Sequence, residues 1–142
     1  MKSSKIMFFT DDDHDDLQLM TMVSDSLGHT SQLFHDGDQL LANLERTDVQ
    51  PDIIFLDITM PRKSGIEILT KLRSMDKTKS IPIVIHSGNC DEKCISECYE
   101  LGANYYVTKA YSYTDLKAAL EYSINTDWST YKAARENFLH EY

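Results

Sequence analysis

Short apolar runs alternate with helix-like segments along most of the chain. The apolar runs are typical of strands, several of them buried on both faces of a sheet, and they lie at 6–9, 29–34, 53–56, 82–86 and 105–107. Between them, apolar residues recur every three or four positions, as on one side of a helix. This spacing predicts helices over 15–27, 36–44, 90–101 and 114–125, and another that begins after Ser64.

Residues with known roles at helix ends support these boundaries. Gly28 and Gly102 each follow the last apolar position of a predicted helix, where glycine commonly ends one. Ser64 and Thr114 stand just before helical stripes, so we expect their side chains to cap the first turns. Five strands that alternate with five helices predict one α/β domain, in which helices cover both faces of a parallel sheet.

Polar side chains gather where the predicted strands end. In open parallel sheets, ligands bind beyond the carboxyl ends of the strands, because the loops there meet at one edge. The residues expected at this edge are Asp11, Asp12, Asp57, Ser87, Thr108 and Lys109. Each alone is commonly a loop residue or a solvated surface group, but their arrival at one edge indicates a site.

The three carboxylates at this edge would repel one another, so that one of them would normally hold a proton. A Mg²⁺ ion removes this conflict, because it takes oxygen ligands and keeps some of its waters. An ion held by Asp12 and Asp57, with Asp11 helping through water, leaves one Asp57 oxygen free as a nucleophile. The charge on a transferred phosphoryl group would be met by Mg²⁺, Lys109 and the Ser87 hydroxyl.

Size and charge narrow the functional class. The chain has 142 residues, which fits one domain, and 23 acidic against 14 basic residues give a formal charge of −9. Such an acidic chain without a basic patch is not expected to bind nucleic acid. No apolar segment is long enough for a membrane span or a signal peptide, and three clustered cysteines indicate reduced thiols, so we expect a cytoplasmic protein.

Several segments, in this order, resemble the receiver domain of two-component response regulators over about residues 5–125. Residues 9–13 (FTDDD) are similar to the first strand and acidic pair of that family, and 55–61 (FLDITMP) to its phosphoacceptor segment. Gly65 fits the small residue at the start of the third helix. Residues 83–88 (IVIHSG) resemble the strand that ends in a switch Ser or Thr, and 101–109 (LGANYYVTK) the segment with the switch aromatic and the lysine.

The resemblance implies a metal site and a phosphoacceptor. Asp11, Asp12 and Asp57 would hold Mg²⁺ together with the backbone carbonyl of Thr59, and Asp57 would be phosphorylated. The donor would be a histidine kinase or a phosphotransfer protein. The chain would be no enzyme beyond self-phosphorylation and autodephosphorylation.

The resemblance also implies a switch. Ser87 would turn toward the phosphoryl group, Lys109 would pair with it, and Tyr106 would swing inward into the space that Ser87 leaves. The face around the fourth helix, fifth strand and fifth helix would then change and contact a downstream protein target. The implied fold is flavodoxin-like, with strand order 2-1-3-4-5, for a receiver domain over 1–125 and an extension over 126–142.

One residue departs from the family pattern. Proline usually follows the lysine, often after a cis peptide bond, whereas Ala110 follows Lys109 here. A cis bond before a residue other than proline costs about 2.5–4 kcal/mol. We therefore expect a trans bond, with Lys109 aimed differently from its counterparts.

Two other functional classes remain open. A degenerate receiver would bind a partner without phosphorylation, which the intact acids, Ser87 and Lys109 argue against and Ala110 allows. A phosphatase with Asp57 as turnover nucleophile would commonly carry an acid two residues later, where this chain has Thr59. A nucleotide- or flavin-binding domain would need a glycine-rich loop, which the sequence lacks.

Residues 126–142 extend beyond the usual end of the family. We expect Asp127 to cap a last helix with an aromatic side formed by Trp128, Tyr131, Phe138 and Tyr142. This helix would either fold back on its own domain or contact a partner, including a second copy in a homodimer. The extension is too short for a DNA-binding output domain, so we do not expect direct transcriptional control.

Cysteines and one histidine lie near these segments without an assigned role. Cys90, Cys94 and Cys98 are four residues apart, which places them on one side of the fourth predicted helix. We expect Cys98 in the core and Cys90 more exposed, and a metal site there would lack a fourth ligand. His86 is expected to pack as an ordinary strand residue.

Overall fold

The computed structural model describes residues 4–89, 91–110 and 112–142, in which five strands alternate with five α-helices. The strands are β1 (Ile6–Thr10), β2 (Thr30–Phe34), β3 (Ile53–Leu56), β4 (Ile83–Ser87) and β5 (Tyr105–Thr108). The helices are α1 (His14–Ser26), α2 (Gly37–Arg46), α3 (Gly65–Ser74), α4 (Glu92–Glu100) and α5 (Tyr113–Asn125), and a 3₁₀ turn, η1 (Arg135–Asn137), follows them.

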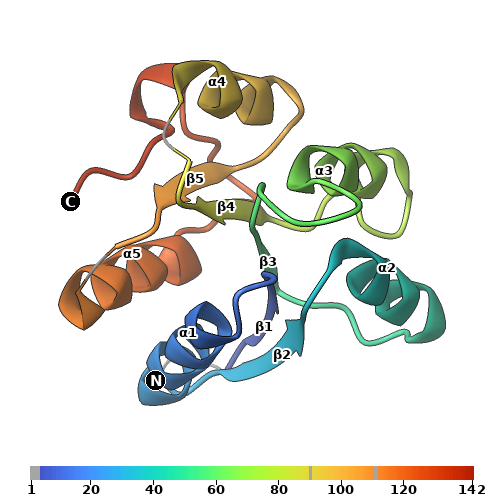
Figure 1. The fold of residues 1–142 in the computed structure, drawn as a ribbon, viewed down its shortest axis with the longest axis horizontal. Coiled ribbons are helices and arrows are strands. Elements are labelled where there is room, and N and C mark those ends of the chain that lie inside the picture. Colours follow the sequence, from blue (N-terminus) through green and yellow to red (C-terminus); the bar gives the residue numbers. More distant parts are fainter. Residues whose placement is uncertain (1–3, 90, 111) are drawn as a thin grey trace.

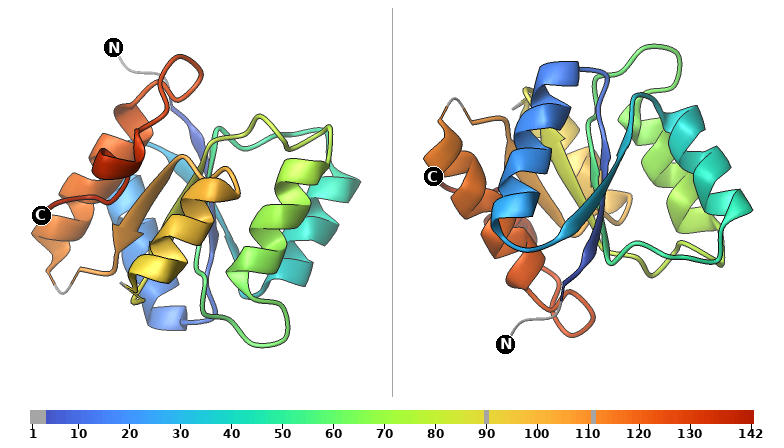
Figure 2. Two further views of the ribbon diagram at one scale, coloured as in Figure 1. Left: turned by 90° about the horizontal axis from the view of Figure 1, so that it is seen from above. Right: turned by 90° about the horizontal axis from the view of Figure 1, so that it is seen from below.

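The strands form one parallel sheet in the order β2-β1-β3-β4-β5, which confirms the expected fold class (Figure 1). Helices α1 and α5 cover one face, and α2, α3 and α4 cover the other (Figure 2). The strand order reverses between β1 and β3, so the loops after these two strands diverge and leave a crevice at their carboxyl ends. The predicted site residues stand at this edge.

Alternation along the strands divides the core into two layers. Phe8 points toward α2, α3 and α4, whereas the adjacent Phe9 points toward α1 and α5, where it contacts Phe55. Every residue of β3 and β4 is buried, as the continuous apolar runs predict. The buried layers fix both strands from either side and therefore hold the residues at their carboxyl ends in place.

Helix ends follow local hydrogen bonding. Ser64 caps α3 as predicted, and Gly28 and Gly102 adopt φ values of +83° and +98° after α1 and α4, which suits glycine at a helix end. Thr114 was predicted to cap the last helix, but Ser112 does so by accepting the Asp115 N–H at 3.1 Å. Both residue types are good caps, and the apolar spacing did not distinguish them. None of the described helices is long and apolar enough to cross a membrane.

The predicted C-terminal α-helix does not form. Residues 126–142 fold back on the domain in an irregular path whose helical part is the short turn η1. Trp128 packs on the α1–α5 side of the sheet, whereas Phe138 packs on the side of α4. These aromatics are thus buried on different layers, which one straight helix with a single apolar side could not achieve.

Candidate functional site

Asp57 stands at the centre of the carboxyl edge, directly after β3. Its side chain is nearly buried (4% exposed), and its backbone N–H donates to the Thr10 carbonyl at 3.0 Å, an extension of the β1–β3 pairing. Its Oδ1 accepts the Thr59 N–H at 3.2 Å, which orients the carboxylate. A Cβ on Gly65 would lie 2.2 Å from the Asp57 carbonyl oxygen, so only glycine lets the start of α3 approach this closely.

Asp11 and Asp12 follow β1 and bring two more carboxylates to Asp57. One ligand oxygen from each of the three acids lies within 4.8 Å of the others. Asp11 is buried, and this burial, together with the nearby charge of Asp57, raises the pKa of Asp11 to about 7, although the Asp13 N–H and Lys109 act in the opposite direction. The three carboxylates therefore repel one another, and a divalent cation would offset this repulsion.

Lys109 follows β5 and extends its ammonium group into the acids. The Nζ atom lies 3.1 Å from Asp57 Oδ2, 3.0 Å from Asp11 Oδ2 and 2.7 Å from Asp16 Oδ2. The Asp11 contact lacks the angle of a hydrogen bond and is an ion pair by distance alone. Burial lowers the pKa of Lys109, but its contacts with Asp16 and Asp11 and the charge of Asp57 outweigh burial and raise it overall.

The peptide bond between Lys109 and Ala110 is trans, as expected. The expectation that a trans bond would aim Lys109 elsewhere is wrong, because the ammonium group reaches Asp57. The Lys109 N–H donates to the Ser87 carbonyl at 2.9 Å, which continues the β4–β5 pairing past the end of β5. This bond fixes the backbone of Lys109, and the lysine side chain is long enough to reach Asp57 from there.

Ser87 ends β4 and is fully buried beside the acids. Its hydroxyl accepts the Asn89 N–H at 3.2 Å. Tyr106, on the neighbouring strand β5, is also fully buried, and its hydroxyl donates to the Asn89 carbonyl at 2.6 Å. Tyr106 thus already occupies an inward position, and the loop after β4 connects it to Ser87.

Asp16 makes the shortest contact with Lys109 but was not among the predicted site residues. It appeared only as part of an acidic run. Asp16 lies one helical turn before Met20, which is buried against the sheet, so the helical phase of α1 turns Asp16 toward the same side. Asp13, by contrast, caps α1 by accepting the Asp15 and Asp16 N–H groups.

The unassigned residues near the site pack as expected. Cys98 is buried in the core, whereas the expectation for Cys90 lies outside the described residues. His86 is buried, and no described group lies within hydrogen-bond reach of either ring nitrogen. Burial, and then the charge of Lys109, lowers the pKa of His86 to about 4, so it stays neutral.

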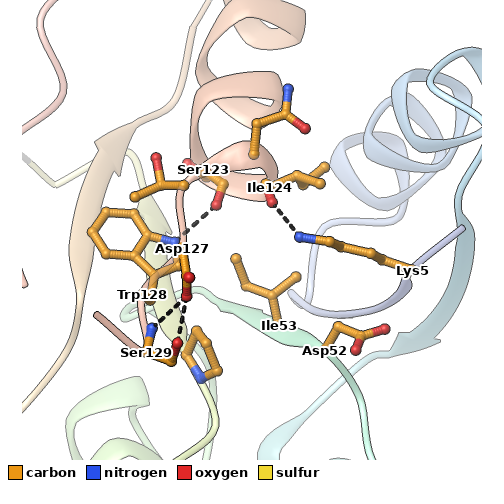
Figure 3. A pocket seen from close by; sticks show the side chains of 11 residues that line it. Lys5, Asp52, Ile53, Ser123, Ile124, Asp127, Trp128 and Ser129 are labelled. Carbon is orange, nitrogen blue, oxygen red and sulfur yellow. Dashed lines mark hydrogen bonds between the residues drawn. The ribbon is translucent and has the colours of Figure 1, made fainter. Parts of the chain in front are cut away.

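A cavity of about 620 Å³ opens onto the site and is lined by Asp12, Asp13, Asp57, Thr59, Gly88, Asn89 and Lys109. It leaves room for a small anionic group beside Asp57. A second cavity, of about 380 Å³, lies at the opposite edge of the sheet between Lys5 and Trp128 (Figure 3). Lys5 Nζ donates there to the Ile124 carbonyl at 2.7 Å, and Trp128 Nε1 to the Ser123 carbonyl at 2.8 Å. These bonds anchor the end of α5.

Comparison with known sequences identifies the family. The sequence profile of the response regulator receiver domain matches residues 7–121. Response regulator Rcp1 of Synechocystis sp. is 28% identical over 119 residues, which cover 79% of this chain and 81% of Rcp1. The transcriptional regulatory protein CpxR of Klebsiella pneumoniae is 30% identical over 92% of this chain, which spans only 54% of CpxR.

Solved structures agree with this result. The phosphorylated cyanobacterial phytochrome response regulator RcpA has a TM-score of 0.77 and 28% identity, over 84% of this chain and 90% of RcpA. The Mn²⁺-bound form of Rcp1 has a TM-score of 0.74 and 27% identity, over 82% and 89% of the two chains. The chain therefore belongs to the response regulator receiver domain family of two-component systems, and the sequence-based resemblance is confirmed.

Proposed function

We propose that this protein is a phosphoacceptor of a two-component phosphorelay and that Asp57 accepts the phosphoryl group. One observation carries the proposal: the buried Asp57 carboxylate lies between a lysine ammonium group at 3.1 Å and two further carboxylates, and a cavity opens beside it. A phosphoaspartate needs this combination, because the acceptor must be fixed and the incoming charge neutralised.

Mg²⁺ would be held by Asp11, Asp12 and Asp57, with the Thr59 carbonyl as a further ligand. The residues fit this ion, since they bring three carboxylates close together and Asp11 has a pKa raised by burial and by Asp57. Mg²⁺ prefers oxygen ligands of this kind, and the relative Rcp1 has been solved in an Mn²⁺-bound form. When bound, the ion would neutralise negative charge at the site of transfer.

In the transfer, an Asp57 carboxylate oxygen attacks the phosphorus of a phosphohistidine on a histidine kinase or phosphotransfer protein. The oxygen–phosphorus bond forms as the phosphorus–nitrogen bond breaks, and the leaving imidazole takes a proton from solvent. Lys109, whose Nζ lies 3.1 Å from Asp57 Oδ2, would meet the charge of the phosphoryl oxygens. The same chemistry with a small phosphodonor gives self-phosphorylation. Attack by water on the phosphoaspartate would release inorganic phosphate and restore the Asp57 carboxylate.

Ser87 and Tyr106 would transmit the change. Ser87 would turn its hydroxyl toward a phosphoryl oxygen, and this rotation would break the bond that the hydroxyl now accepts from the Asn89 N–H. Because Tyr106 bonds to the Asn89 carbonyl, a movement of this loop alters the support of Tyr106 and so the face formed by α4, β5 and α5. A downstream protein would read this face. The proposal includes a cytoplasmic location, supported by the free thiols of Cys94 and Cys98.

Intact-mass analysis tests the proposal. The chain is incubated with phosphoramidate and Mg²⁺, beside Asp57→Asn and the exposed-surface control Asp25→Asn. We expect a single phosphoryl adduct on the wild type and on Asp25→Asn, no adduct on Asp57→Asn, and none when EDTA removes the metal. The absence of an adduct on the wild type, or an equal adduct on Asp57→Asn, would contradict the proposal.

A further inference from the structure

The segment after α5 returns to the edge of the sheet and runs beside β5. Figure 1 shows it in red next to β5 and α4, and in Figure 2 it passes between α4 and α5. Trp128 anchors its start through the bond to the Ser123 carbonyl (Figure 3). Its ring also contacts that of Tyr105, with the ring centroids 5.6 Å apart. From there the chain reaches the outer side of β5, which is the last strand of the sheet and has no further strand of the sheet beside it.

The backbone of this segment pairs with β5. The Tyr106 N–H donates to the Phe138 carbonyl at 3.1 Å, and the His140 N–H donates to the Tyr106 carbonyl at 2.8 Å. Tyr106 and Leu139 thereby form a parallel bridge. An edge strand presents N–H and C=O groups that attract another extended chain, and these two bonds use that property of β5.

Side chains fix the segment from both faces of the sheet. Phe138 is fully buried and lies edge-on to Tyr99 of α4, with ring centroids 5.3 Å apart, and close to Tyr106. On the other face, His140 Nδ1 lies 2.8 Å from the Tyr105 hydroxyl. Phe138 thus points toward α4 and His140 toward α5, on opposite faces of the sheet. Side chains that alternate in this way give a bound strand its specificity.

Charged groups extend the contact over the surface of α4. The Arg135 guanidinium pairs with Glu92 and donates to the Ser96 hydroxyl, with Nε at 3.2 Å. The Lys132 ammonium lies 4.7 Å from the centre of the Tyr99 ring. Both basic side chains meet an acidic or aromatic partner on α4, so the segment complements this face in charge as well as in shape.

We propose that the outer edge of β5 and the adjoining surface of α4 form a binding site for an extended peptide strand, and that residues 134–142 are its resident occupant. The site takes a protein segment with an aromatic residue at the place of Phe138 and a basic residue at the place of Arg135. It goes beyond phosphoryl transfer and does not depend on it. A partner that reads this face in strand form must first displace the resident segment.

The resident segment is held by non-covalent contacts that another strand of similar sequence could reproduce. Two backbone hydrogen bonds and the Tyr142 hydroxyl, which donates to the Thr108 carbonyl, hold it to β5, and the buried Phe138 anchors it. Its ion pair with α4 lies at the surface, where such pairs contribute little. Covalent attachment supplies the remaining advantage, because a tethered segment acts at an effective concentration in about the millimolar range. A free segment of the same sequence should therefore bind only when the resident one is weakened.

Proline substitutions in the full chain weaken the resident segment selectively. His140→Pro removes the N–H that donates to Tyr106, whereas Glu141→Pro, one residue later, removes an N–H that donates to no backbone carbonyl in the described structure. His140→Ala controls for loss of the ring. We expect the Tyr106 amide proton to exchange at least about tenfold faster in His140→Pro than in Glu141→Pro, with His140→Ala in between.

The Ile54 amide, which donates to the Pro82 carbonyl in the sheet, reports whether the domain stays folded. It should exchange equally in all these chains. If His140→Pro accelerates Ile54 exchange as well, the surface variant Arg135→Ala is used in place of His140→Pro. Its control is Arg46→Ala on α2, which also removes one guanidinium group. The proposal is wrong if neither His140→Pro nor Arg135→Ala accelerates Tyr106 exchange relative to its own control.

The binding site itself is tested with a fluorescent synthetic peptide of residues 131–142. Its anisotropy should show binding to His140→Pro at least about tenfold tighter than to the wild type or Glu141→Pro, because the resident segment blocks the latter two. A peptide with Phe138→Ala should not bind. Equal affinity for all three chains, no binding to any of them, or binding that survives loss of the aromatic anchor would overturn the proposal.

Discussion

Lys109 Nζ lies closer to Asp16 Oδ2, at 2.7 Å, than to Asp57 Oδ2, at 3.1 Å. The lysine is thus shared between the proposed phosphoacceptor and an acid of α1 that takes no part in the metal cluster. Asp16 competes with an incoming phosphoryl group for the Lys109 ammonium group. Its negative charge also repels the phosphoryl group. Its loss should free Lys109 for the transferred group.

Asp16→Asn is therefore expected to speed phosphorylation by phosphoramidate by roughly fivefold, which corresponds to about 1 kcal/mol in the barrier. Lys109→Ala should slow it instead. The adjacent exposed residue gives a control, because Asp15→Asn removes the same charge without a contact to Lys109. The measurement is the initial rate of adduct formation by intact mass. If Asp16→Asn slows the reaction as much as Lys109→Ala, Asp16 positions the lysine and does not compete for it.

The stability of the metal-free protein should fall as pH rises. The pKa of Asp11 is about 7 in the folded chain, against an ordinary value of 3.8. Between about pH 4 and 7 the folded chain holds a proton that the unfolded chain has released, so the free energy of unfolding decreases with rising pH across this window. Urea unfolding in EDTA at several pH values measures the slope. Asp11→Asn should flatten it, and an unchanged slope would refute this assignment.

Mg²⁺ affinity should show the opposite dependence on pH. Because Asp11 must lose its proton to neutralise the ion, apparent affinity should weaken by up to about tenfold for each pH unit below 7 and level off above it. Equilibrium dialysis or calorimetric titration at pH 6, 7 and 8 gives this profile. Affinity that is constant between pH 6 and 8 would show that Asp11 does not ligate the ion as a carboxylate.

Gly65→Ala should destabilise the fold, because the added Cβ would lie 2.2 Å from the Asp57 carbonyl oxygen and 2.6 Å from the Ile58 Cα atom. We expect a loss of about 1–3 kcal/mol in the free energy of unfolding. Gly88→Ala is the matched control, since a Cβ there meets no atom within 4 Å. Urea unfolding compares the two, and equal stability would mean that the start of α3 can move away from Asp57 at little cost.

Tyr106→Phe should remove the hydroxyl that donates to the Asn89 carbonyl at 2.6 Å and leave the ring in its buried place. The expected loss is about 1 kcal/mol of stability, together with faster amide exchange in the loop after β4. Tyr113→Phe, at a 40%-exposed position, should change neither quantity. If amide exchange in the loop after β4 is unaltered in Tyr106→Phe, the Tyr106 hydroxyl does not stabilise this loop.

Much of this architecture could be predicted from the sequence, because periodic burial is recorded in it directly. The continuous runs of β3 and β4 are buried on both faces, and this placed Asp57 and Ser87 at one edge of the sheet. Gly65 could also be recognised, since a family pattern and a backbone approach of 2.2 Å demand the same residue.

The errors concern contacts between distant segments. The aromatic spacing from Trp128 to Phe138 suited a helix, but the two side chains are buried in different layers, and pairing with β5 determined the backbone conformation. Lys109 was expected to be misdirected by Ala110, although its side chain is long enough to reach Asp57 from a trans peptide. Asp16 escaped notice because its partner lies 93 residues away in the sequence.

The identity of the phosphorylated residue tests the central claim most directly. The wild-type chain is phosphorylated with phosphoramidate and Mg²⁺, the acyl phosphate is reduced with borohydride, and the modified residue is located by peptide sequencing in a mass spectrometer. We predict conversion of Asp57 to homoserine, with Asp11, Asp12 and Asp16 unmodified. Modification at any of those three acids in place of Asp57, or a phosphoryl group on a histidine or serine, would contradict the account.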